Sequence, residues 1–115
     1  MEKNYDIGKK NQLEVEINYN DDYEFIEATF TYKFGKSEMT TYNIIIERDD
    51  RFNDLYTAIY NETYFTYEAG ARLDIIVNHD EVNFHDIGLN IKIPIENTEQ
   101  AFGKVYEAYV KYFNK

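Results

Sequence analysis

Hydrophobic and polar residues alternate with a period of two along the early part of the chain. The stretch 13–19 has an apolar residue at every second position, and so does most of the stretch 23–34. Such alternation is typical of strands that bury one face, and the turn-forming residues 20–22 between the two stretches predict a hairpin. The alternation changes phase near Phe25 and Ile26, which predicts a β-bulge at that point.

The position of the bulge determines which residues of the hairpin face each other. We expect apolar residues to pair on the buried face and polar residues to pair on the outer face. On the outer face this register sets Glu16 opposite Glu27. The predicted buried pairs are Ile17 with Ile26, Val15 with Ala28, and Leu13 with Phe30.

A third strand follows at about 38–47, and its register depends on the turn before it. A three-residue turn at 35–37 sets mostly apolar residues against each other, whereas a two-residue turn does not. The apolar run 44–46 favours a central strand that is covered on both faces. The predicted pairs are Tyr32 with Thr40, Phe30 with Tyr42, Ala28 with Ile44, and Ile26 with Ile46.

Two later segments show the spacing of amphipathic helices. The first spans about 50–62, with Asp49 or Asp50 as its N-cap. The second spans about 98–113 and begins with a capping box formed by Asn97 and Gln100. The predicted apolar stripes are Phe52, Leu55, Tyr56, Ile59 and Tyr60 on the first helix, and Phe102, Val105, Tyr106, Tyr109, Val110 and Phe113 on the second.

Between the helices the pattern returns to strands, at 64–67, at 73–77 and along 82–95. A phase change near His85 and Asp86 predicts a bulge or a break at that point. The order of elements is therefore βββαβββα. We expect an α+β fold in which one antiparallel sheet of about five to six strands packs against the two helices. The length of 115 residues suits a single domain over 1–115, with 1–11 as a flexible N-terminal segment.

The charge balance changes the functional picture. The chain has 22 acidic and 12 basic residues, a formal net charge of −10, and the basic residues are scattered. Direct binding to nucleic acid or to an anionic membrane is therefore disfavoured, and a basic partner is favoured. A purely solubilising role for the charge is the alternative.

The chain has no cysteine and no apolar signal-peptide core, which predicts a cytoplasmic protein. Its wealth of residues with A/T-rich codons suggests a bacterial or phage gene.

Few residues offer catalytic or metal chemistry. The sequence Gly35-Lys36-Ser37 resembles the end of a phosphate-binding loop, but strands flank it and Phe30 occupies the place of the required glycine. The cluster around His79 and His85 could hold a metal only if a tight loop brought the two imidazoles together, and turn formation is the favoured interpretation of its aspartates. We predict no enzyme activity, no cofactor and no metal.

The predicted binding surface is the acidic hairpin, which has six carboxylates over 14–27 and no basic residue. Nearby tyrosines would serve as anchors, and Tyr42, Tyr64, Tyr67 and Tyr112 are the aromatic residues least firmly assigned to the core. The predicted contact residues are Glu14, Glu16, Asp21, Asp22, Glu24 and Glu27.

In size, charge and lack of catalytic apparatus the chain resembles small acidic inhibitors, although it has no motif specific to one group. These groups are anti-CRISPR proteins, DNA mimics that block restriction, and immunity proteins of nuclease toxins. The resemblance implies a non-enzymatic inhibitor of a basic, nucleic-acid-processing protein such as a nuclease. Two alternatives stay open: a small-molecule-binding domain with an aromatic-lined pocket, and a structural subunit, which exposed Ile45 and Ile76 would favour.

Overall fold

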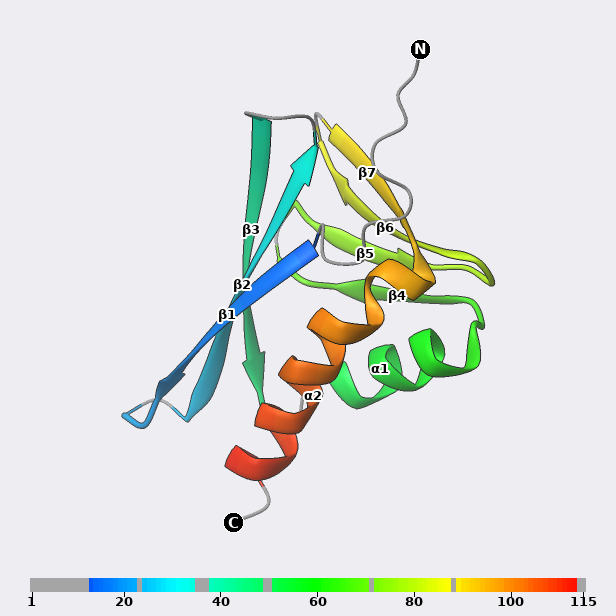
Figure 1. The fold of residues 1–115 in the computed structure, drawn as a ribbon. Coiled ribbons are helices and arrows are strands. Elements are labelled where there is room, and N and C mark those ends of the chain that lie inside the picture. The colour runs from blue at the N-terminus through cyan, green and yellow to red at the C-terminus, as the bar shows by residue number, and fades with distance from the viewer. Residues whose placement is uncertain are drawn as a thin grey trace.

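The first three strands form an antiparallel sheet with the order β1-β2-β3 (Figure 1). We describe a computed structural model over residues 13–22, 24–34, 38–48, 51–70, 72–87 and 89–113. β1 spans Leu13–Asn20, β2 spans Phe25–Phe34 and β3 spans Glu38–Glu47. The expected flexible segment 1–11 lies outside the described residues.

The predicted register of the first hairpin is wrong by two residues. Ile17 pairs with Ala28 rather than with Ile26, and Glu16 pairs with Thr29 rather than with Glu27. No bulge interrupts the pairing. The phase change occurs in the turn instead, where Glu24 has a φ of 60° and its N–H donates to the carbonyl oxygen of Asn20 at 2.8 Å. A shift of two keeps the side chains of β1 and of residues 26–34 on their predicted faces. Phe25 is the exception: the predicted bulge placed it on the buried face, but without the bulge it lies on the outer face, opposite Asn20 and Glu47.

The register of β3 against β2 is confirmed: Tyr32 pairs with Thr40, and the pairing runs without interruption from Phe34–Glu38 to Phe25–Glu47. The expectation of a central, doubly covered β3 is wrong, because β3 ends its sheet. Ile44 and Ile46 are buried, whereas Ile45 is 40% exposed on the outer face.

The first helix, α1, spans Phe52–Asn61, close to the predicted range. Its N-cap residue is Arg51, which makes no side-chain capping hydrogen bond; the predicted caps Asp49 and Asp50 lie outside the described residues. Of the predicted apolar stripe, Phe52, Leu55 and Ile59 are buried and Tyr56 packs against the core. Tyr60 is 74% exposed instead, and Ala58, which was not predicted, is buried.

The later strands form a second antiparallel sheet with the order β4-β5-β6-β7, so the prediction of one sheet is wrong. Strands that follow each other pair as hairpins in both sheets, but α1 separates β3 from β4, and no pairing crosses this helix. Local patterns predict such hairpins, whereas they carry no signal for how two hairpin groups join. The strands are β4 Phe65–Glu68, β5 Asp74–Val77, β6 Glu81–Asp86 and β7 Leu89–Pro94.

Of the two predicted alternatives near His85 and Asp86, a bulge or a break, the structure shows the break, in the form of a hairpin turn. Asp86 pairs with Leu89, so the chain reverses between them, and Ile87 at the turn is 74% exposed. This turn divides the predicted strand 82–95 into β6 and β7. It explains why the described chain contains seven strands rather than five or six.

The second helix, α2, spans Glu99–Phe113. Of the predicted stripe, Phe102, Val105 and Phe113 are buried in the core and Tyr106 and Tyr109 pack against it, whereas Val110 is not part of this packing. The predicted capping box is wrong because Pro94 is followed by a short 3₁₀ helix, η1, over Ile95–Asn97, which includes Asn97. Thr98 precedes α2 instead. Its carbonyl oxygen accepts the N–H of Phe102, and its hydroxyl donates to the carbonyl oxygen of Ile95 at 2.8 Å.

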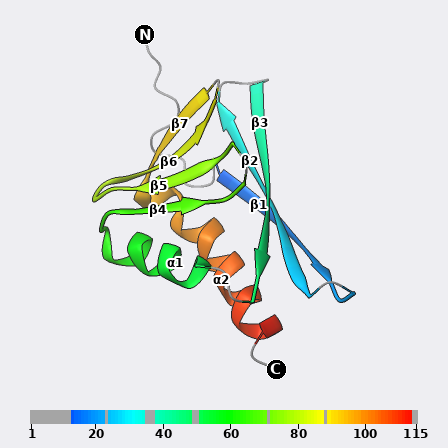
Figure 2. The ribbon, with the colours of Figure 1, turned by 180° about the vertical axis from the view of Figure 1, so that it is seen from behind.

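The core lies between the two sheets and α2 (Figures 1 and 2). Phe30 of β2 contacts Phe84 of β6 and Phe102 of α2, with ring centroids 5.6 and 4.8 Å apart. The helices contact each other through Tyr56 and Tyr106, whose rings stack at 4.2 Å. No helix among the described residues is long and apolar enough to cross a membrane.

Candidate partner-binding face

The outer face of the first sheet, opposite the core, presents carboxylates on all three strands. Because side chains alternate along a strand, Glu14 and Glu16 of β1 lie on this face, about 7 Å apart from the strand rise. Glu27 of β2 and Glu47 of β3 lie on it as well. We call these four residues the acidic face.

Polar residues accompany Glu14 and Glu16 across the sheet, whereas Ile45 faces Glu27 and Phe25 faces Glu47. Thr29 and Asn43 continue the row that starts at Glu16, and Thr31 and Thr41 continue the row that starts at Glu14. The side-chain amide of Asn43 donates to Thr29 Oγ1 at 2.9 Å and to Glu27 Oε2 at 3.0 Å. This network fixes the position of the Glu27 carboxylate on a rigid part of the sheet.

One lysine of the described residues lies on this face. Lys33 Nζ is 3.6 Å from Glu14 Oε2, and both side chains are about half exposed. An exposed pair of this kind contributes little to stability. The four carboxylates of the acidic face therefore outnumber the cations, and the surface is strongly negative.

The remaining predicted residues, Asp21, Asp22 and Glu24, lie in the β1–β2 turn and are exposed. Asp21 and Glu24 line a depression of about 290 Å³ together with Arg48, Tyr112 and Phe113. The structure therefore divides the predicted surface into two parts. Glu14, Glu16 and Glu27 share the sheet face, whereas Asp21 and Glu24 lie toward the end of α2.

The hydroxyl of Tyr112 holds this turn against α2. It lies 2.9 Å from Asp21 Oδ1 and 3.1 Å from the carbonyl oxygen of Asn20, and its proton is shared between the two acceptors. Desolvation raises the pKa of Tyr112 above its ordinary value; the hydrogen bond to Asp21 and the charges of Asp21 and Glu24 raise the pKa further, while Arg48 opposes them. Asp21 thus has a structural partner within the chain.

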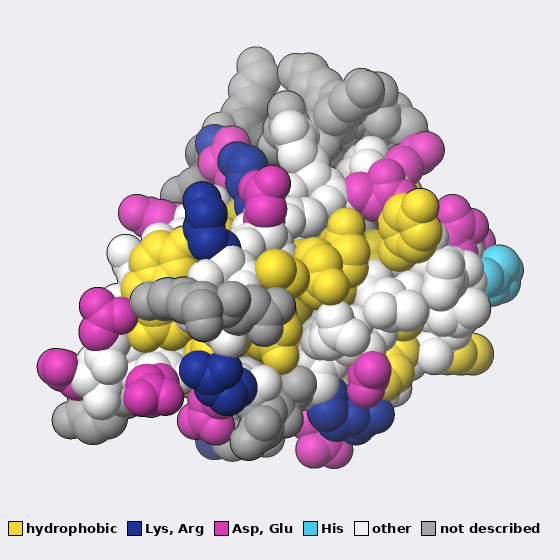
Figure 3. All heavy atoms as spheres, turned by 90° about the horizontal axis from the view of Figure 1, so that it is seen from below, with side chains coloured by type: hydrophobic (Ala, Val, Ile, Leu, Met, Phe, Trp, Pro, Cys, Tyr) yellow, Lys and Arg dark blue, Asp and Glu magenta, His cyan; other side chains and the backbone are white. Residues whose placement is uncertain are grey.

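Acidic side chains gather at the end of the molecule where this hairpin projects. Figure 3 views the molecule from below, and its left end, which corresponds to the β1–β2 hairpin in Figure 1, carries several Asp and Glu side chains around a hydrophobic patch. Glu47 belongs to the same surface but is missing from the predicted set. Glu47 could have been predicted from the sequence, because the β2–β3 register, which is confirmed, places residues 41, 43, 45 and 47 on the outer face.

The tyrosines considered as anchors fall into three groups. Tyr42 and Tyr67 are buried, at 8% and 3% exposure, and Tyr112 is half-buried. Tyr64 is 79% exposed, but it lies just before β4 of the second sheet rather than beside the acidic face. Tyr19 of β1 is half exposed and contacts Tyr112, with ring centroids 5.1 Å apart, so both tyrosines lie beside the β1–β2 turn.

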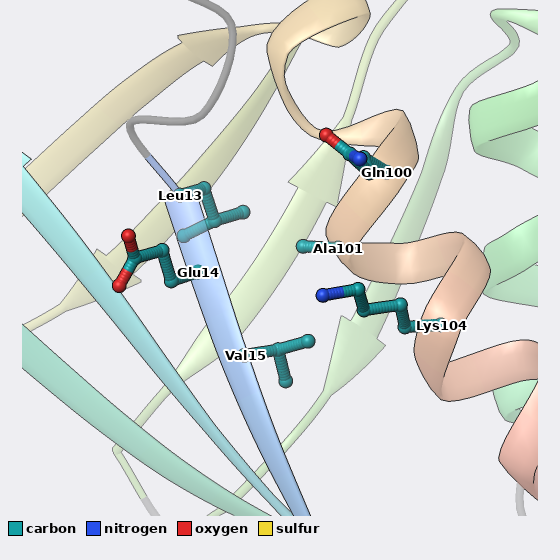
Figure 4. Close-up of a pocket in the computed structure, with 6 residues that line it drawn as sticks. All are labelled: Leu13, Glu14, Val15, Gln100, Ala101 and Lys104. Carbon is teal, nitrogen blue, oxygen red and sulfur yellow. The ribbon is translucent and has the colours of Figure 1, made fainter.

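A cavity of about 320 Å³ lies between β1 and α2 and is lined by residues of both elements (Figure 4). Leu13 and Val15 point toward the helix, and the Lys104 side chain extends toward the strand. Glu14, Gln100 and Ala101 complete the lining, which contains no aromatic residue. This cavity differs from the aromatic-lined pocket expected of a small-molecule-binding domain.

The histidine cluster is spread over the β5–β6 turn and the strand that follows. His79 lies in the turn, 4.0 Å from its neighbour Asp80, and both side chains are largely exposed. His85 lies on β6 and is exposed. Within the described ranges, no three His, Asp or Glu side chains come together as metal ligands would.

Comparisons with protein-family models, with curated proteins and with solved structures found no match to this chain.

Proposed function

We propose that this protein is a small, non-enzymatic inhibitor that binds a basic, nucleic-acid-processing protein through its acidic face and the adjoining turn. The single observation that carries the proposal is the arrangement of Glu14, Glu16, Glu27 and Glu47 on one sheet surface, with Lys33 as the cation beside them. In this proposal the protein acts in the cytoplasm of a bacterial or phage-infected cell.

The sheet holds the four carboxylates apart on one surface. Their direct cross-strand partners are uncharged: Glu14 faces Thr31, Glu16 faces Thr29, Glu27 faces Asn18 and Ile45, and Glu47 faces Phe25. A basic cleft that binds nucleic acid offers cations that would compensate this negative charge. Complementary charge also accelerates encounter and sets the orientation of the partner.

The first experiment is a pull-down with the tagged protein from a nuclease-treated bacterial lysate, washed at about 0.1 M and about 1 M salt. The screening length falls roughly threefold between these concentrations. We expect a basic nucleic-acid enzyme that is retained at low salt and reduced at high salt. Inhibition of that enzyme by the purified protein would then test the proposed activity.

Charge reversal tests the surface once that enzyme is in hand. We expect the combined substitutions Glu14→Lys, Glu16→Lys and Glu47→Lys to preserve the fold, because all three side chains are exposed. The association rate should fall about tenfold or more at low salt, with a smaller change in the dissociation rate. Stopped-flow or surface-plasmon measurements give both rates.

A matched variant separates position from total charge. Glu68, Glu96 and Glu107 are exposed acids on β4, η1 and α2, and their reversal to lysine changes the net charge by the same amount. This variant should keep an association rate within about threefold of the wild type. An equal loss in both variants would show that only net charge matters and would contradict the proposed face.

A further inference from the structure

The four outermost strands of the two sheets differ in how their free edges are protected. β1 lies beside α2, and β4 lies beside α1. β7 carries Lys92 and Pro94, two residues that hinder pairing with another strand. β3 has none of these protections: within the described residues β2 is its one partner strand, and the helices pack chiefly on other strands.

The composition of β3 also suits an additional strand. Its ten residues, EMTTYNIIIE, include no lysine, arginine, proline or glycine, and its pairing with β2 has no bulge. Ile45, at 40% exposure, adds an apolar contact on the outer face. Natural proteins usually protect an edge of this length, because its unpaired N–H and C=O groups are a template for another chain.

We infer that the free edge of β3 binds an extended segment of the basic partner as a fourth strand of the first sheet. This inference rests on the proposed function and gives it a binding mode, β-strand addition. Side chains of an added strand alternate between the two faces, so every second residue would join the outer face next to Thr41, Asn43 and Glu47. Lysine or arginine at those positions would lie beside Glu47 on β3, with Glu27 one strand further from the edge and Glu14 and Glu16 two strands further.

Charge determines whether the edge of β3 favours a basic segment of the partner or a second copy of this chain. Two copies joined through β3 would bring together two acidic faces and two chains with a net charge of −10 each. Like charges opposite one another in a sheet are destabilising. A basic segment meets attraction over the same surface, so the partner strand is favoured.

The test uses synthetic peptides of about ten residues, a length that matches the strand. In the first peptide lysine and valine alternate; in the second the same residues form one lysine block and one valine block. Two further versions of the alternating peptide carry N-methyl groups on all lysine nitrogens or on all valine nitrogens. Since backbone N–H groups of a strand alternate between its two edges, only one of these versions blocks the edge that faces β3.

We expect the alternating peptide to bind at least about tenfold more tightly than the block peptide. One N-methylated version should lose binding while the other retains it. Amide hydrogen exchange of the labelled protein, followed by NMR, should slow in β3 and stay unchanged in β7, the internal control.

Three results would overturn the inference. If all peptides bind equally and β3 exchange does not change, the acidic face attracts cations without adding a strand, and the proposed function survives. If no lysine peptide binds at low salt, the acidic-face proposal loses its support as well. If light scattering shows a dimer with protected β3 amides before any peptide is added, the occupant is a second copy.

Discussion

Glu24 adopts a left-handed backbone conformation, with a φ of 60°, at the point where the chain enters β2. This conformation costs a residue with a side chain about 1–2 kcal/mol. The turn keeps it because the Glu24 N–H bonds to Asn20 and because Tyr112 binds both Asn20 and Asp21. The acidic turn therefore has a defined position relative to α2, which a surface that recognises a partner requires.

Substituting Tyr112 by Phe tests this attachment. Because the pKa of Tyr112 is raised in the folded protein, the folded state holds the phenol proton more tightly than the unfolded state does. The stabilisation is complete below the ordinary tyrosine pKa of about 10 and is lost as the pH rises through the folded pKa. We expect Tyr112→Phe to lower the free energy of unfolding at pH 7 and to make its decline above pH 10 less steep.

Urea unfolding at a series of pH values gives both quantities. Tyr60→Phe is the matched control, because it also removes one phenol but from a residue that is 74% exposed. The attachment of the β1–β2 turn to α2 through Tyr112 would be refuted if Tyr112→Phe and Tyr60→Phe had the same free energy of unfolding at every pH.

At the scale of elements, short-range patterns predicted most of what was observed. Period-two alternation located β1 to β3 and their faces, and the requirement for a buried face selected the correct β2–β3 register. The same reasoning failed for β1–β2, because Glu24 takes a backbone conformation that sequence pattern does not favour. It also left a bulge or a break open between β6 and β7, because a turn containing Ile87 has the apolar content of a strand. Glu47 was missed although its register was predicted correctly.

Two identical substitutions test the β6–β7 hairpin. Ile93 is fully buried and Ile87 is 74% exposed, although the alternating pattern placed both residues in the same phase. We expect Ile93→Ala to lower the free energy of unfolding by about 2–5 kcal/mol. Ile87→Ala should change it by less than about 0.5 kcal/mol. Comparable losses for the two variants, measured by chemical denaturation, would favour one continuous strand with both side chains in the core.

At the scale of the whole molecule, Phe102 connects elements that the sheets leave unpaired. Its ring lies 4.8 Å from Phe30 of the first sheet, 6.1 Å from Phe84 of the second sheet and 6.5 Å from Phe52 of α1. It is fully buried. Within the described part of the chain no strand pairing joins the two sheets, so shared side-chain packing couples them, and Phe102 is central to that packing.

This coupling predicts that the two sheets unfold together. In the wild type we expect one transition, coincident when followed by far-ultraviolet circular dichroism and by tyrosine fluorescence. Phe102→Ala should lower the free energy of unfolding by about 3–5 kcal/mol. Conservative Phe102→Leu should cost less, because it leaves a smaller cavity between the sheets. Two separate transitions in the wild type would mean that the acidic sheet folds independently, and the single-domain prediction would then be wrong.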